Sequence, residues 1–376
     1  MSTSQNRLPW VDTLRLAALL MVIAAHSVDI YNATPQADET ATFWGSFLGS
    51  AMRPCVPLFA MMTGLLLLPT SESASIVYRK RIPRVAIPAL LWSAIYCLMP
   101  WIIGLAGGGA DTVRIFFPFA YEPSPELGDA LSNMAIIPFD FGDYTTHMWY
   151  IYMLIGLYFA LPFISTWLKE SSLVKIFMTL WAVSLALPYV EWLVGSDVLG
   201  VCEWNPFGMF YYFGGFAGYM ILGWMLGRSE PQGKVWKSVV LGCMMYAAGL
   251  LITWKGHSTM SSLYSYEENP AMLELFWQFL SPNVALMTMG IFLIARRIKV
   301  YCATTQRTLA TFTKHSFGCY LVHYLFIGPA TMVVAPLHLP IPAGIALTVL
   351  IVFAASWALS ALMHLICGRA ARYIIG

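Results

Sequence analysis

The chain has 376 residues, of which 59% are hydrophobic and 11% charged, whereas a soluble globular domain carries about 25% charged residues. With a mean hydropathy of +0.67, this composition excludes a soluble globular protein and predicts an all-α, polytopic membrane protein. The formal net charge of +2 gives no indication of nucleic-acid binding, because the charges are segregated by loop.

Apolar runs long enough to cross about 30 Å of hydrocarbon predict membrane-spanning helices. In chain order, these ten runs cover residues 12–31, 43–68, 85–106, 147–168, 174–194, 207–227, 236–254, 272–295, 312–334 and 342–366. We expect a single integral-membrane domain over residues 1–376, with no appended soluble domain. The 107–146 connection is predicted to be a long extracytoplasmic loop. Its length and aromatic content favour a short interfacial or re-entrant segment that covers a cavity.

The basic residues indicate how the spans are oriented. They gather in alternate connections and near both ends of the chain, and only Arg53, Arg114 and Lys255 lie on the opposite side of the predicted membrane. By the positive-inside rule, the basic connections and both termini are therefore expected in the cytoplasm.

The first span carries Arg15 and His26 in an otherwise apolar helix. Eleven residues make about three turns, so both side chains leave the helix on nearly the same side, roughly 16 Å apart along its axis. Asp12 and Asp29 stand at contact spacing from Arg15 and His26, where they would hold the guanidinium and orient the imidazole. Ionisable groups inside a span by default mark function. The alternative is an interfacial His–Asp pair and a snorkelling arginine.

A cationic cluster, YRKRIPR at residues 78–84, stands at the entry to the third span. Arginine forks bind phosphate oxygens in pairs, and the spacing of Arg81 and Arg84 lets both face one anion. The cluster therefore predicts a phosphate site. The alternative is a cationic turn that only signals topology.

Arg53 is the only basic residue at an outward helix end in the first half of the chain. Pro54 and Pro57 loosen the backbone next to it. Two roles stay open: an ion pair with Asp29, or positioning of a substrate or an oxyanion.

The fourth and ninth spans add aromatic residues and histidines. Trp149 and Tyr150 suit either an interfacial aromatic belt or stacking against a sugar. His147 is expected at the water boundary, as a polar contact to the substrate. His323 lies near mid-membrane, where it needs a polar partner: either it forms a structural hydrogen bond or it lines the reaction cavity.

The sequence lacks the motifs of several classes of functional site. HExxH and paired intramembrane carboxylates are absent, so no metal site is predicted, and neither a P-loop nor a GxSxG nucleophile elbow is present. The seven cysteines show no CxxC or Cys/His cluster, so we expect free thiols, mostly buried.

The motifs, in their order along the chain, resemble a known family. They are Asp12-x-x-Arg15, Arg15-x10-His26, VPLFAMMTG at 56–64, Arg81-x-x-Arg84, HMWYIYMLIGLYFALP at 147–162, YFGGFAGYMILGWMLG at 212–227 and SFGCYLVH at 316–323. The set resembles the membrane acyltransferase-3 family of bacterial multi-span O-acyltransferases. The form without a fused esterase-like domain is similar to the enterobacterial common antigen O-acetyltransferase. Thr63-Gly64 replaces the family's common Ser-Gly, a mild change.

The resemblance implies an enzyme of the bacterial cytoplasmic (inner) membrane that moves an acetyl or other short acyl group from cytoplasmic acyl-CoA to a hydroxyl of an envelope glycan. Acetyl-CoA is then a cosubstrate, and no permanently bound cofactor is expected. A glycan or lipid-linked saccharide and membrane lipid are the expected partners. The family's Arg–His and RxxR pairs match Arg15 with His26 and Arg81 with Arg84.

The chemistry of the donor and the acceptor agrees with this resemblance. Arg79, Arg81 and Arg84, helped by Arg15, would hold the phosphates of acyl-CoA, while its thin pantetheine arm passes between helices. His26 would then serve as the general base that deprotonates a sugar hydroxyl for attack on the thioester.

Details of the transfer stay open. Asp29 would orient His26, and Arg53 or a tyrosine of the fourth span would stabilise the oxyanion. Direct transfer and an acetyl-histidine intermediate are both consistent with the sequence.

Two other functions compete with acyl transfer. A transporter or flippase of a lipid-linked sugar or small anion would use Arg15 and His26 to line a permeation path, although inverted repeats and intramembrane acids are missing. In a scaffolding membrane protein, His26 would be structural.

Overall fold

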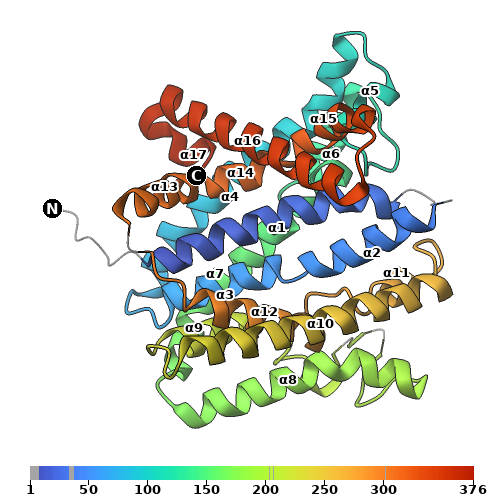
Figure 1. Cartoon of the computed structure of the whole chain (residues 1–376). Coiled ribbons are helices and arrows are strands. Elements are labelled where there is room, and N and C mark those ends of the chain that lie inside the picture. Colours follow the sequence, from blue (N-terminus) through green and yellow to red (C-terminus); the bar gives the residue numbers. More distant parts are fainter. Residues whose placement is uncertain (1–7, 34–37, 203, 206, 301) are drawn as a thin grey trace. The chain divides into compact units, whose positions relative to one another are not determined.

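The computed structural model describes the whole chain except residues 1–7, 34–37, 203, 206 and 301, and its described part is helical without a strand (Figure 1). The helices are α1 (Pro9–Ala33), α2 (Glu39–Met52), α3 (Cys55–Leu67), α4 (Ala74–Leu105), α5 (Ala110–Phe116), α6 (Leu127–Ile136), α7 (Trp149–Trp167), α8 (Ser171–Val194), α9 (Ala217–Gly227), α10 (Val235–Leu263), α11 (Pro270–Leu273), α12 (Pro282–Ala295), α13 (Ala303–Lys314), α14 (Ser316–Val322), α15 (Tyr324–Val334), α16 (Ile341–Cys367) and α17 (Ala371–Ile374). The predicted all-α class is confirmed.

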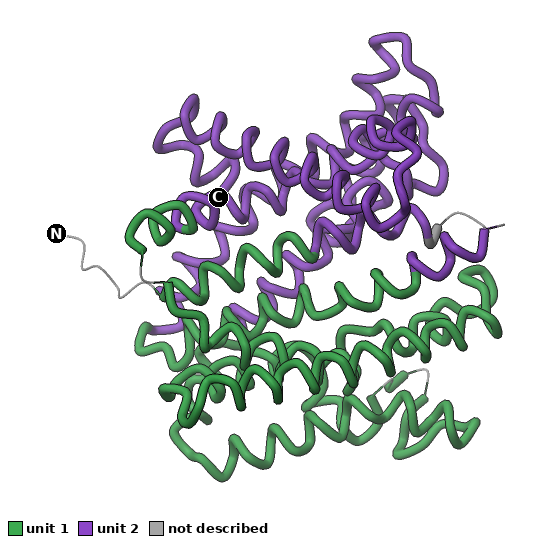
Figure 2. The backbone as a smooth tube through the Cα atoms, in the orientation of Figure 1, with its two compact units in different colours: residues 1–21, 46–72, 160–309 green, residues 22–45, 73–159, 310–376 purple. Residues whose placement is uncertain are grey.

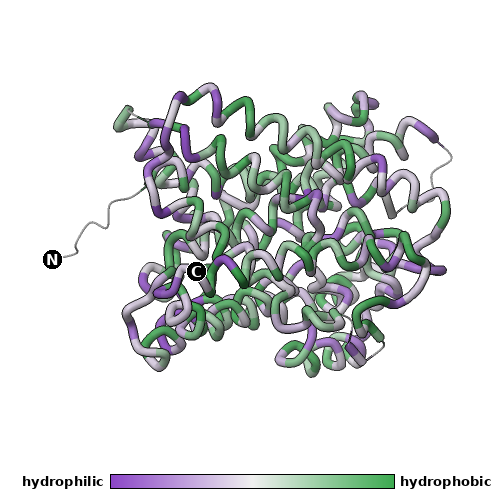
Figure 3. Tube along the Cα trace, turned by 90° about the horizontal axis from the view of Figure 1, so that it is seen from below, coloured by the Kyte–Doolittle hydropathy of each residue, from purple (hydrophilic) through white to green (hydrophobic). Residues whose placement is uncertain are grey.

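Seven of the described helical segments are long and apolar enough to cross a membrane, or eight if a bent pair counts as one span. Hydrophobic residues dominate these helices (Figure 3), whose backbone polar groups are satisfied within the helix as a bilayer requires. The protein is therefore an integral membrane protein. The predicted count of ten is not confirmed, because α9 and α12, in the regions expected to hold the sixth and eighth spans, are shorter apolar helices.

The chain forms two compact units, coloured separately in Figure 2. Unit 1 contains residues 1–21, 46–72 and 160–309, and unit 2 contains residues 22–45, 73–159 and 310–376. Four helices, α1, α2, α7 and α13, contribute one part to each unit.

Unit 1 is held together by close helix crossings at glycines. In the α3–α9 pair, a Cβ atom added to Gly64 would lie 1.7 Å from the carbonyl oxygen of Met220, and one added to Gly223 would lie 2.0 Å from that of Met61. In the α10–α12 pair, Gly242 and the facing glycine of α12 meet backbone to backbone in the same way. Such small-residue contacts allow van der Waals packing where lipid removes the hydrophobic drive for association.

Unit 2 contains the 107–146 connection, which the structure folds into α5 and α6. A Cβ atom at Gly328 of α15 would lie 1.7 Å from the carbonyl oxygen of Ile115, at the end of α5, so these two helices touch directly. At the end of the chain, Trp92 of α4 donates its indole N–H to the carbonyl of Ile374 at 2.8 Å. The short segment predicted within 107–146 is thus helical, while its extracytoplasmic position stays a prediction.

Two predicted spans are interrupted at a polar residue. The second breaks between α2 and α3, where Pro54 and Pro57 supply no N–H and the N–H of Arg53 bonds the carbonyl of Ser50 instead. The ninth, predicted to be continuous over 312–334, bends by 84° at His323. There the ring Nδ1 of His323 lies 2.6 Å from the carbonyl oxygen of Tyr320, the group that would otherwise accept the next helical hydrogen bond.

Candidate active site

His26 and Asp29 lie one turn apart on α1 and touch. Their Nδ1 and Oδ2 atoms are 3.3 Å apart, and the side chains are 25% and 36% exposed. An imidazole that donates Nδ1–H to a carboxylate keeps its Nε2 lone pair available to accept a proton. The predicted contact is therefore present, and its part in catalysis stays a prediction.

His26 belongs to a cluster of three histidines around Tyr324, all within unit 2. The ring centre of His26 lies 5.4 Å from that of His323 and 5.6 Å from that of Tyr324. His147 stacks on Tyr324 at 4.6 Å and meets His323 edge to face at 5.5 Å. The structure thus brings together His26, His147 and His323, which the sequence offered as three separate candidates.

Two of these histidines are buried, and three of their four ring nitrogens lack a hydrogen-bond partner. His147 is 2% exposed and His323 is fully buried, and both nitrogens of His147 and Nε2 of His323 lack a hydrogen bond. Unsatisfied polar atoms of this kind are costly unless they serve a ligand or an ordered water. The 3₁₀ segment Asp143–Met148 places His147 between the rings of Tyr96 and Tyr324, and its position at the water boundary stays a prediction.

Tyrosine hydroxyls fix the frame around the cluster. Tyr320 donates to the carbonyl of His147, Tyr96 donates to that of Leu321 at 2.9 Å, and the hydroxyl of Tyr324 lies 3.3 Å from that of Thr146. Each contact ties the region around α14–α15 to another element, so the histidine rings have little freedom to move.

Phenylalanine rings from the 107–146 connection pack against the same frame. Phe117 is fully buried and lies 6.1 Å from Tyr96 and 4.9 Å from Tyr144, and Phe119 lies 5.8 Å from Tyr324. The connection therefore contributes to the surroundings of the histidine cluster.

Trp149 and Tyr150, the predicted sugar-stacking residues, begin α7. Tyr150 is buried and meets Tyr320 edge to face at 5.4 Å, and Trp149 is half-buried beside it. Tyr150 thus packs into the frame of the cluster, and sugar contact by either ring stays a prediction.

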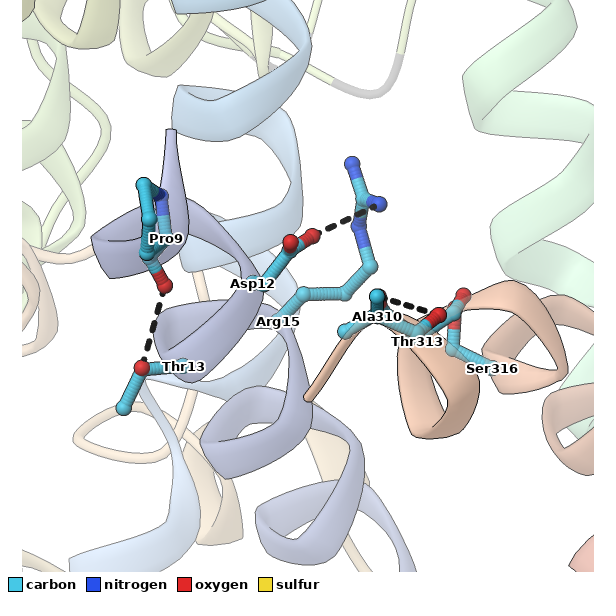
Figure 4. Close-up of polar contacts among 7 residues, drawn as sticks. All are labelled: Pro9, Asp12, Thr13, Arg15, Ala310, Thr313 and Ser316. Atoms are coloured by element: carbon cyan, nitrogen blue, oxygen red, sulfur yellow. Dashed lines mark hydrogen bonds and ion pairs between the residues drawn. The ribbon is translucent and has the colours of Figure 1, made fainter. Parts of the chain in front are cut away.

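Arg15 lies in the part of α1 that belongs to unit 1 and pairs with Asp12. Their Nη1 and Oδ1 atoms are 3.9 Å apart, with the side chains 30% and 8% exposed (Figure 4). Asp12 restricts the guanidinium as the spacing predicted, and phosphate binding by Arg15 stays a prediction.

The basic cluster, predicted at the entry to the third span, lies within the first turns of α4. Arg81 and Arg84 are three residues apart on this helix and therefore share a face. Arg81 is half-buried and its Nε has no hydrogen-bond partner, while Arg79 and Arg84 are exposed. A guanidinium with an unsatisfied, buried donor next to a second one suits a phosphate group.

Arg53 lies in unit 1, against aromatic rings that the sequence analysis did not single out. Its guanidinium carbon is 4.0 Å from the ring centre of Trp277 and 5.8 Å from that of Phe279. His257 stacks on the same indole at 3.5 Å. Sequence alone gives no signal for this group, since its members come from the junction of α2 and α3, from α10 and from the segment before α12.

Among the described residues, no group of three or more His, Cys, Asp or Glu side chains is arranged to hold a metal ion.

A family model described as an acyltransferase domain matches residues 8–361 of the chain. No curated protein and no solved structure matches it, and the particular similarity to the enterobacterial common antigen enzyme stays a prediction.

Proposed function

The chain belongs to the acyltransferase family whose domain spans residues 8–361, and on that premise we propose that it is an O-acyltransferase of the bacterial inner membrane. It would transfer an acetyl or other short acyl group from acyl-CoA to a hydroxyl of an envelope glycan. The observation that carries the proposal is His26, held by Asp29 next to the buried His323, whose Nε2 has no hydrogen-bond partner.

In this proposal His26 acts as the general base. Its Nε2 takes the proton of the acceptor hydroxyl as the hydroxyl oxygen bonds to the thioester carbonyl carbon; the C–S bond breaks and the proton passes to the CoA thiolate. Positioned proton transfer contributes about 10²–10⁴ in rate. Direct attack by the acceptor and prior acetylation of His26 are both compatible with this geometry.

The other members of the cluster would bind the acceptor. His147 and His323 carry unpaired ring nitrogens, which suit hydrogen bonds with sugar hydroxyls or the developing oxyanion. Trp149 offers a half-buried ring for stacking against a sugar.

Arg79, Arg81 and Arg84 would bind the phosphates of the donor. Their place in the first turns of a helix that continues as an apolar span agrees with a cytoplasmic position for the nucleotide end of acyl-CoA. Acyl-CoA is a cosubstrate in this scheme, which requires no metal ion.

A direct test is transfer of label from radiolabelled acetyl-CoA to a crude envelope-glycan extract by the purified protein. We expect label in glycan with the wild type and at least a 100-fold lower rate with His26→Ala. His364→Ala is a matched control at a histidine outside the cluster. Transfer that persists in a folded His26→Ala protein would overturn the assignment of the base.

The broken spans at Arg53 and His323 favour one alternative, a transporter or flippase of a lipid-linked sugar or small anion, because discontinuous helices line the binding sites of many transporters. Proteoliposomes distinguish the two functions. A transporter moves its substrate without acyl-CoA, whereas an acyltransferase releases free CoA in step with glycan labelling.

A further inference from the structure

Arg53 stands at the midpoint of the candidate span Glu39–Leu67, between the end of α2 and the start of α3. A cation within a membrane-spanning segment is costly and by default marks a functional site. It also lies at the start of a 13-residue helix, whose N-terminal end carries a partial positive charge. Two positive groups thus meet at one interruption of the helix.

The guanidinium rests on a fixed aromatic platform within unit 1. The indole N–H of Trp277 donates to Ser50 Oγ at 2.8 Å. The same ring stacks on His257, with centres 3.5 Å apart and planes 6° from parallel. His257 is held in turn by Ser46, whose Oγ lies 3.0 Å from Nδ1. Trp277 is therefore fixed at its edge and its face before any ligand arrives.

Stacking on Trp277 leaves the donors of Arg53 unsatisfied. A cation–π contact uses the face of the guanidinium, while its N–H groups point outward in its plane. Nε is buried without a hydrogen-bond partner, and within the described part of the chain no carboxylate forms an ion pair with Arg53. Nε therefore keeps an unmet donor, which an anion oxygen would satisfy while a second oxygen binds an adjacent Nη.

We propose that Arg53, on its platform of Trp277, is a binding site for the phosphate group of an amphiphile. Phosphate matches the paired donors of the guanidinium. Phosphates carried on lipid chains are available to a membrane protein as phospholipid head groups and as the diphosphates that link a sugar to a polyprenyl chain. This assignment replaces the oxyanion role that the sequence left open for Arg53, and the proposed acyl transfer draws instead on the histidine cluster and the arginines of α4.

Equilibrium binding to the detergent-solubilised full chain tests the site with three probes. Geranylgeranyl diphosphate carries phosphate on a lipid chain, geranylgeraniol carries the same chain without phosphate, and inorganic pyrophosphate carries the phosphate alone. We expect the diphosphate to bind saturably, geranylgeraniol at least 10-fold more weakly, and pyrophosphate more weakly than the amphiphile.

Variants assign the binding to Arg53. Arg53→Gln is expected to weaken diphosphate binding by about 10- to 100-fold, the range for loss of charge-assisted hydrogen bonds. Arg53→Lys keeps the positive charge but lacks the paired donors of the guanidinium. Its affinity for the diphosphate should therefore lie between those of the wild type and Arg53→Gln. Arg114→Gln, a change at an exposed arginine of unit 2, is the matched control and should bind like the wild type. If Arg53→Gln does not fold, Trp277→Phe replaces it and should also weaken binding.

Each outcome decides. Equal binding of geranylgeranyl diphosphate and geranylgeraniol, or unchanged diphosphate binding in both Arg53 variants, would overturn the phosphate site. Pyrophosphate binding as tightly as the amphiphile would refute the lipid-borne source and assign the site to a soluble phosphate. Loss of binding in Arg53→Gln together with normal acyl transfer would show that the two sites act separately.

Discussion

Replacing Gly223 by alanine tests the α3–α9 crossing, and its effect follows from one distance. The added methyl would lie 2.0 Å from the carbonyl oxygen of Met61, whereas ordinary contact begins at 3.4 Å, so the helices must part by about 1.4 Å. Because the obstacle is backbone, we take the upper end of the usual cost of overpacking, about 3 kcal/mol. Alanine regains about 1 kcal/mol through helix propensity, which leaves a net loss of about 2 kcal/mol.

Gly156→Ala is the matched control, since Gly156 is also a helical glycine within an apolar span but has nothing within 4 Å of an added Cβ. This variant should be up to about 1 kcal/mol more stable than the wild type. The measurement is the free energy of unfolding in mixed micelles, with the two variants about 3 kcal/mol apart. A Gly223→Ala protein as stable as Gly156→Ala would refute the crossing and the argument from backbone contact.

Three further predictions concern catalysis, topology and a loop. Asp29→Asn should lower the turnover of acyl transfer about 10-fold without changing the KM for acyl-CoA, a modest factor because the pair is partly exposed; an unchanged turnover would remove Asp29 from the mechanism. Hydrogen bonding at the start of α13 lowers the pKa of the exposed Cys302 thiol, so a maleimide should label it readily. With an impermeant reagent on intact cells, Cys202 but not Cys302 should react if the basic connections are cytoplasmic. Labelling of Cys302 but not of Cys202 would show the opposite topology. Arg297→Ala should speed proteolysis of the 228–234 loop severalfold, since Arg297 donates to three of its carbonyls; equal cleavage rates would show that these contacts do not order the loop.

The sequence was sufficient wherever the determining interaction is local. Long apolar runs predicted the positions of the helices, because hydropathy and the needs of the backbone in lipid leave few other structures. The contacts of Asp12 with Arg15 and of Asp29 with His26 followed from spacing on one helix, where residues three apart are neighbours. These parts of the candidate site required no knowledge of tertiary packing.

Non-local contacts could not be predicted from spacing. His147 and His323 are 176 positions apart in the chain, and only the packing of the segments that carry them brings their rings within 5.5 Å. The burial of His147 was missed for the same reason, since the rings that cover it come from α4 and α15. The site of Arg53 was incomplete because Trp277 lies on a connecting segment with no periodic pattern.

The two glycine motifs show how a family pattern becomes a physical requirement. In the sequence analysis, VPLFAMMTG and the glycine-rich stretch at 212–227 contributed to the family resemblance only as motifs in their order along the chain. In the structure, Gly64 meets the backbone of Met220 and Gly223 meets that of Met61, so the two motifs are the two sides of one helix crossing. The crossing fixes α3, the helix that begins beside Arg53. A residue that never touches substrate can therefore be as necessary as a ligand, because it determines where the start of that helix and its positive end lie.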